Sequence, residues 1–246
     1  MDQLNLPWEA LTTRFILFLA QPLPPTIDLW RLIAEAEPEV DENRPREGLR
    51  RQIGPLGDRI LEVSISAVRV DIALVPSVEL HVGGGFGATL GEFESAMNAL
   101  HGPLLRVLAN FPAIFSRLAF NGGALTRTGS VDESYRVLAQ LCRSVEVRPE
   151  MRDFQFRVNW QKQSGRPGVG YYNRLTTFSA LSVMAEFATS PSAPRSALQN
   201  HYALMDLDVN TPADRRGAFA PEAIGTIFED LLALVRQNLM FGEVRG

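Results

Sequence analysis

Two aspartates, Asp206 and Asp208, are the residues whose type and spacing most directly suggest chemistry. With Asn210 they match the first three ligands of an EF-hand calcium loop. The match ends there, because Thr211 stands where the turn glycine belongs and Gly217 where the bidentate glutamate belongs. The run MDLDVN is typical of a strand, on which alternate side chains share one face. Two such carboxylates can hold Mg²⁺ with water, or pair with arginines of neighbouring strands, and we favour the pairing.

A glycine-rich run, HVGGGFGATLGEFE at residues 81–94, raises a second possibility. Gly83, Gly85 and Ala88 fit a loose G-x-G-x-x-A pattern. A dinucleotide site needs a βαβ unit around such a loop, and a Walker-type loop needs G-K-[ST], which is missing here. We therefore interpret residues 83–87 as a turn from sheet to helix that uses backbone angles open to glycine. Anion binding by its N–H groups stays an alternative.

Polar residues alternate with apolar ones along the segments that we expect to be strands. An antiparallel sheet can expose one face to water, so these polar residues predict either an ordinary solvated face or a concave surface that receives a partner. The predicted binding surface consists of Arg69, Asp71, Gln155, Arg157, Asn159, Arg174, Asp206 and Asp208.

The remaining reactive side chains form no catalytic or metal-binding pattern. His81, His101 and His201 lie in three separate elements without paired spacing. Cys142 is the only cysteine, which excludes an internal disulfide, and its place on an apolar stripe indicates a small core residue. No G-x-S-x-G motif occurs. We expect no metal and no cofactor, and we lean towards a protein that is not an enzyme.

Charge and aromatic content give little support for nucleic-acid binding. The formal net charge is −4, and Lys162 is the only lysine beside many arginines, which suggests a GC-rich bacterial genome. The segment at residues 157–179 interleaves arginines with Trp160, Tyr171 and Tyr172, a combination that can stack on bases. Trp160, however, falls on the apolar side of its strand, and acidic neighbours dilute the positive charge. Binding of nucleic acid is thus a minor alternative.

The elements of the first half are predicted from periodicity and capping. Residues 14–20 form a short apolar strand, and Thr26 caps a helix that ends near Ala36. The charged, Pro- and Gly-containing residues 37–59 predict a solvated loop. Period-2 alternation then predicts two or three strands in residues 60–82. A capping box at Thr89 begins a long helix, which Pro103 must kink or split.

The second half begins again with a strand, at residues 115–125. Ser130 and Glu133 form another capping box for a helix. Residues 153–163 alternate cleanly and pair as a hairpin with the segment that follows the SGRPGVG turn. A last strand at residues 201–210 precedes a helix opened by Pro221, at a position that favours proline.

The order strand, helix, strands, long helix thus occurs twice, without any repeat of residues. We predict an α+β fold in which one curved, mainly antiparallel sheet packs on long helices. Two pseudo-repeated halves, residues 1–112 and 113–246, would form one compact unit. The order looks like that of TATA-binding-protein-like or helix-grip folds, an analogy that implies no function.

Complete folding signals without a surviving catalytic pattern favour a non-enzymatic binding or adaptor component of a bacterial cytoplasmic complex. Its partner would be another protein or a second copy of itself. The N-terminal residues do not resemble a signal peptide, and no apolar run is long enough to span a membrane. The alternatives are a Mg²⁺-dependent hydrolase or nuclease centred on Asp206 and Asp208, and a small-ligand pocket between sheet and helices.

Overall fold

The computed structural model describes residues 4–24, 27–34, 36–77, 89–110, 115–187, 196–215 and 217–244. Within these ranges the elements follow one order twice: a strand, a helix, four strands and a helix. The first series is β1 (Glu9–Leu19), α1 (Leu29–Ile33), β2 (Val40–Arg44), β3 (Leu49–Leu56), β4 (Arg59–Ile65), β5 (Arg69–Val75) and α2 (Phe93–Asn110). The second series is β6 (Phe115–Thr128), α3 (Val131–Leu141), β7 (Gln155–Asn159), β8 (Lys162–Gln163), β9 (Tyr171–Phe187), β10 (Ser196–Asn210) and α4 (Pro221–Phe241).

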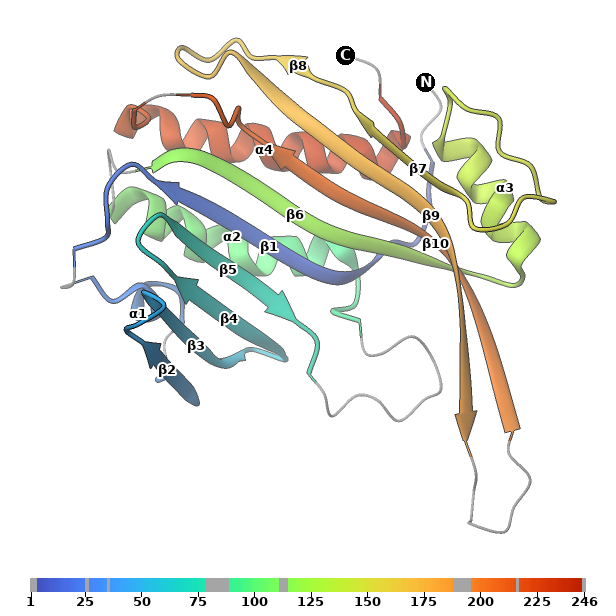
Figure 1. Ribbon diagram of the computed structural model, residues 1–246, viewed down its shortest axis with the longest axis horizontal. Coiled ribbons are helices and arrows are strands. Elements are labelled where there is room, and N and C mark those ends of the chain that lie inside the picture. The colour runs from blue at the N-terminus through green and yellow to red at the C-terminus, as the bar shows by residue number, and fades with distance from the viewer. Residues whose placement is uncertain are drawn as a thin grey trace.

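The strands form a 10-stranded sheet in the order β2-β3-β4-β5-β1-β6-β10-β9-β7, with β8 paired to β9. Every described pair of strands is antiparallel. β1 and β6 join the two series at the centre, and the sheet curves across the front of the molecule (Figure 1). The predicted mixed α+β class with a mainly antiparallel sheet is confirmed. Only α2 and α4 are long, whereas α1 is a single turn of 5 residues.

The core lies between the sheet and the helices α2 and α4, which run behind it (Figure 1). Aromatic rings join the layers: Phe15 of β1 contacts Phe120 of β6 and Phe228 of α4, with ring centroids 5.0 and 5.1 Å apart. Gly122 faces these rings, and a Cβ there would lie 2.9 Å from Phe120 and from Phe93 of α2. The helices can approach the sheet this closely because position 122 has no side chain.

Two of the predicted helix starts are confirmed. The Ser130 Oγ accepts a hydrogen bond from the N–H of Glu133, and the Glu133 carboxylate accepts one from the N–H of Gly129. Pro221 occupies the first turn of α4. The start of α2 differs from the prediction, because the helix begins at Phe93 rather than directly after Thr89. Pro103 does not split α2 into two helices.

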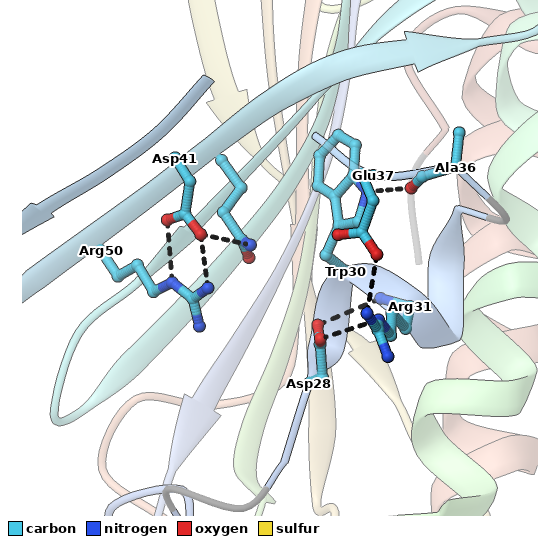
Figure 2. Close-up of polar contacts among 8 residues, drawn as sticks. Asp28, Trp30, Arg31, Ala36, Glu37, Asp41 and Arg50 are labelled. Carbon is cyan, nitrogen blue, oxygen red and sulfur yellow. Dashed lines mark hydrogen bonds and ion pairs between the residues drawn. The ribbon is translucent and has the colours of Figure 1, made fainter. Parts of the chain in front are cut away.

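The predicted loop at residues 37–59 is wrong, because this segment forms the hairpin of β2 and β3 and the start of β4. Its charges pair across the strands: Asp41 accepts two hydrogen bonds from the Arg50 guanidinium (Figure 2). A hairpin at a sheet edge exposes side chains on both faces, so charged residues are compatible with it and resemble a loop in composition.

The short helix α1 anchors this hairpin to the rest of the fold. The Trp30 indole lies 3.0 Å from the position of a Cβ on Gly54 of β3, and its N–H donates to the Ala36 carbonyl (Figure 2). The helix is capped by Asp28, whose carboxylate accepts from the N–H of Arg31. The predicted cap, Thr26, lies outside the described residues.

The predicted hairpin of the second half is confirmed, since β7 and β8 both pair with β9. The last strand, β10, begins at Ser196, earlier than predicted. The glycine loop 83–87 and the predicted boundary between the halves at residue 112 lie outside the described residues. None of the described helices is long and apolar enough to cross a membrane.

Candidate binding face

Asp206 and Asp208 lie on the face of the sheet opposite the helices, which we call the open face. Their neighbours on β10, Met205 and Leu207, alternate with them and are buried, with 0 and 2 % of their surface exposed. Side chains on successive strand positions point to opposite faces, so both carboxylates share one side. The predicted common orientation of the two aspartates is therefore confirmed.

The open face is hollowed at this point by a depression of about 380 Å³. We call this depression the acidic hollow. It is lined by Thr12, Asn121, Gly122, Gly123, Gln155, Arg157, Leu175, Thr177, Asp206, Leu207 and Asp208. A Cβ on Gly123 would lie 3.3 Å from the Cβ of Leu11 and 3.5 Å from a carboxylate oxygen of Asp206. The absence of a side chain at this glycine keeps the floor of the hollow low.

Strand β7 places Arg157 in the same row as Asp206. Arg157 is opposite Thr177 of β9, and Thr177 is opposite Asp206 of β10. One strand lies between them, so their backbones are about 10 Å apart at the usual strand spacing. The structure gives neither side chain an ion pair with any described residue. The hollow thus has a carboxylate on one wall and a guanidinium on the other, each available to a bound group.

Asp206 is exposed as a residue, but its carboxyl is partly buried in the hollow. Burial of this carboxyl by its surroundings raises its pKa above the ordinary value, and no nearby cation opposes that effect. The expectation that Asp206 pairs with an arginine of a neighbouring strand is not met by the described residues. A carboxylate that is desolvated without a cation becomes more stable when a positive group binds to it.

Asp208 is held by amides instead of by an arginine. Asn210 donates to its carboxylate at 2.8 Å, and Asn173 donates in turn to the Asn210 carbonyl oxygen at 3.1 Å. Asn159 then donates to Asn173 at 2.9 Å, which extends the chain of amides from β10 across β9 to β7. The amide chain fixes one carboxylate oxygen of Asp208 and continues the polar surface beside the hollow.

The predicted residues of the first series lie on the same face but form closed ion pairs. Arg69 of β5 donates to Asp71, and Arg14 of β1 approaches the same carboxylate at 4.0 Å. The guanidiniums of Arg69 and Arg117 also cover the Phe18 ring, at 5.7 and 4.6 Å from its centroid. Apart from the Arg69 Nε, which makes no hydrogen bond to a described residue, these groups pair with one another, so this part of the open face behaves as a structural network.

The prediction that Arg174 belongs to the open face is wrong. It is 2 % exposed and faces the helix side, where it donates to the carbonyls of Trp160 and Val244 and to the Gln237 amide oxygen. Burial lowers the pKa of the guanidinium. The orientation follows from Phe178, because residues of the same parity on β9 share the side that packs on the core.

Several residues of the open face were missed by the sequence reasoning. Thr12, Asn121 and Thr177 line the hollow, and Asn173 and Asn210 form the amide chain beside it. The alternation of side chains along residues 121–125 and 171–177 could have predicted that Asn121 and Asn173 lie on the open face. Thr12 has no such signal, since the register of β1 against β6 shifts between Ala10 and Thr12.

Metal binding would depend on two carboxylates alone. Within the described ranges, no group of three or more His, Cys, Asp or Glu side chains is arranged to hold a metal ion. Asp206 and Asp208 therefore lack a third protein ligand of that kind, and any Mg²⁺ here would keep most of its waters.

Two larger depressions flank the C-terminal part of α4. One, of about 570 Å³, lies beside Lys162, Arg166 and Tyr172, and the other, of about 640 Å³, lies beside Trp8 and Arg236. In the first, Asp230 accepts hydrogen bonds from Arg166 and from the Tyr172 hydroxyl.

Comparison with known proteins gives no information about this site. No protein-family model matches the chain, and no curated protein matches it either.

Proposed function

We propose that this protein is a non-enzymatic binding component whose open sheet face receives a protein partner. The observation that supports this most is the pair of unmatched charges in the acidic hollow, Asp206 and Arg157. A partner that presents a cationic side chain to Asp206 and an acidic one to Arg157 complements both groups. Such complementarity sets specificity and orientation at an interface.

The composition of the surrounding surface is consistent with this role. Asn159 and Asn173 of the amide chain are exposed or half-buried and keep spare hydrogen-bonding capacity, because each amide has several donor and acceptor sites. Leu175, which lines the hollow, provides apolar surface near these polar groups. Apolar contacts framed by polar groups are typical of protein interfaces.

The test is affinity purification of the native protein in two charge-reversed forms. Asp206→Lys places a cation in the hollow, whereas Asp214→Lys makes the same change at an exposed aspartate outside it. We expect a stoichiometric partner with wild type and with Asp214→Lys, and its loss with Asp206→Lys. Equal recovery of the partner with both variants, or repeated recovery of the protein without any partner, would contradict the proposal.

The same two aspartates support the second candidate, a Mg²⁺-dependent hydrolase or nuclease. A desolvated carboxylate without a protein cation also suits a divalent ion. This function predicts that millimolar Mg²⁺ or Mn²⁺ raises the melting temperature and that Asp208→Ala removes the increase. An unchanged melting temperature of wild type counts against it. A small-ligand-binding role at the α4 depressions stays the third candidate, and a ligand retained in native mass spectrometry tests it.

We also propose that residues 1–112 and 113–246 are structurally related halves, as in TATA-binding-protein-like or helix-grip folds. The doubled element order supports this, as does the sheet order, in which each first strand lies beside the last strand of its own series. Superposition of β1–β5 on β6–β10 tests the relation. The single cysteine and the arginine-rich composition favour a bacterial cytoplasmic setting, which fractionation of the host would check.

A further inference from the structure

The strands β9 and β10 continue beyond the rest of the sheet as a two-stranded arm (Figure 1). Their mutual pairing runs from Asn173–Asn210 to Phe187–Ser196. On the outer side of β9, the pairing with β7 ends at Ser179. On the outer side of β10, the pairing with β6 ends at His201. Past these points, no other described strand pairs with the arm.

The outer edge of β9 from Ala180 to Phe187 is the longer of the two free edges. At the usual rise per residue it spans about 26 Å. An isolated two-stranded ribbon is only marginally stable in water, and three or more strands are normally needed. A free edge of this length is also a template for pairing with another strand, which proteins usually block with charges or proline.

The arm has little such protection. Between Ala180 and Phe187, the free edge of β9, Glu186 is the only charged residue. Met184, on the free edge, is 63 % exposed. The edge of β2, by contrast, carries Asp41, Glu42 and Arg44 within the single strand VDENR. One outer edge of this sheet is therefore protected by charge, and the edge of the arm is open.

Charge and symmetry together identify the occupant. A chain of formal charge −4 repels a copy of itself least where the facing surfaces carry few charges, as the free edge of β9 does with Glu186 alone. A strand edge is also complementary to itself, because two copies related by a two-fold axis form an antiparallel pair. Closed two-fold dimers are the commonest protein assemblies.

We propose that two copies of this chain dimerise by antiparallel pairing of their β9 edges, centred on Met184. Side chains alternate along a strand, so an axis perpendicular to the paired strands must bring one residue opposite its own counterpart. With Met184 at the centre, residue 181 pairs with residue 187 of the other copy, and all pairs stay within the free edge. The two sheets then join into one continuous sheet across the dimer.

Charge substitution at the centre tests this arrangement. Met184→Glu places two like charges opposite each other in the dimer, and Met184→Lys does the same with the opposite sign. Val68→Glu is the matched control, because Val68 is 66 % exposed but lies outside the arm. By light scattering we expect twice the chain mass for wild type and Val68→Glu, and the single mass for each Met184 variant.

Mixing the two variants distinguishes self-pairing from loss of a different partner. Glu and Lys at position 184 attract across the axis, so an equimolar mixture should recover the double mass as a heterodimer. A wild-type chain that is monomeric at 100 μM, a Met184→Glu variant that stays dimeric, or a mixture that stays monomeric would each overturn the proposal. Neither variant touches the acidic hollow, so the outcome is independent of partner binding there.

A cysteine cross-link gives an independent reading of the register. The only native cysteine, Cys142, is buried, and burial with the nearby Glu243 raises its thiol pKa to about 12, which keeps it unreactive at neutral pH. Met184→Cys should therefore form a disulfide-linked dimer on mild oxidation, because facing Cβ atoms lie within about 5 Å. Val68→Cys should stay monomeric. Equal cross-linking of both variants, or of neither, would contradict the register.

Discussion

The two sides of the open face use charge in opposite ways. On the side of β3, β4 and β5, Arg51 donates two hydrogen bonds to Glu62 at 2.8 Å, and Arg69 donates to Asp71. On the side of β10 and β7, Asp206 and Arg157 lie in one row of the sheet without pairing. A polar sheet face is therefore not uniform: ion pairs close the surface at one end, while free charges keep it available at the other.

The comparison is clearest between two arginines of the second series, Arg174 and Arg157. Replacement of Arg174 by Met should cost about 3 kcal/mol in the free energy of unfolding, because three acceptors, one buried and two partly buried, lose their donor. Arg157→Met should change it by less than about 0.5 kcal/mol, as expected for an exposed side chain. Urea unfolding measures both. Similar losses would mean that Arg157 also has a structural role.

Two adjacent glycines, Gly122 on the core face and Gly123 on the open face, give a second comparison of the same kind. Gly122→Ala introduces a Cβ 2.9 Å from two phenyl rings and should destabilise the fold by about 2 kcal/mol through overpacking. Gly123→Ala places its Cβ farther from its nearest neighbours, 3.3 Å from the Leu11 Cβ and 3.5 Å from Asp206, and it should lower partner affinity more than stability. Thermal unfolding and partner titration distinguish these effects. The reverse order of destabilisation would contradict the assignment of faces.

These contrasts also show how far the sequence leads. The doubled element order, the capping box at Ser130 and the shared face of Asp206 and Asp208 are local patterns, and periodicity alone predicts them. Capping and alternation depend on residues close in the chain. They are therefore readable without knowing which strands become neighbours.

The wrong predictions concern segments whose structure depends on residues distant in the sequence. The segment at residues 37–59 has the composition of a loop, yet Trp30 and Gly54 fit together and hold it as a hairpin. Around Arg174 both faces of β9 carry polar and apolar residues, so the sequence does not show which way it points. Its burial depends on three acceptors from other parts of the chain: Trp160, Gln237 and Val244. The pairing of each charge on the open face depends on sheet order, which composition does not reveal.

A closed ion pair should show its own pH dependence. The Arg51 guanidinium holds the pKa of Glu62 below its ordinary value, so its stabilisation is present above that value and lost as pH falls through the lowered pKa. Glu62→Gln should therefore cost about 1 kcal/mol at pH 7, and the cost should vanish in acid. Unfolding at pH 7 and at pH 3 measures the difference. A cost that is independent of pH would indicate a packing effect.

The smallest expected change in stability concerns Asp206, and its pH dependence has the opposite sign to that of Glu62. Burial raises the pKa of this carboxyl, so its protonated form is favoured in the folded chain. The resulting stabilisation is present below the ordinary pKa of 3.8 and is lost as pH rises through the raised pKa. Asp206→Asn keeps a neutral side chain at every pH and should raise stability at pH 7 by no more than about 0.5 kcal/mol.

The informative quantity is the difference between Asp206→Asn and Glu62→Gln across one pH series. The first variant should gain on wild type as pH rises from 3 to 7, and the second should fall behind it over the same range. Partner affinity should respond differently from stability. Asp206→Asn should weaken binding, because it removes the charge that faces a cation of the partner. Glu62→Gln should leave binding unchanged, because that charge is already paired. If Asp206→Asn were destabilised at pH 7, the carboxylate would be serving the fold, and the acidic hollow would resemble the closed network across the sheet.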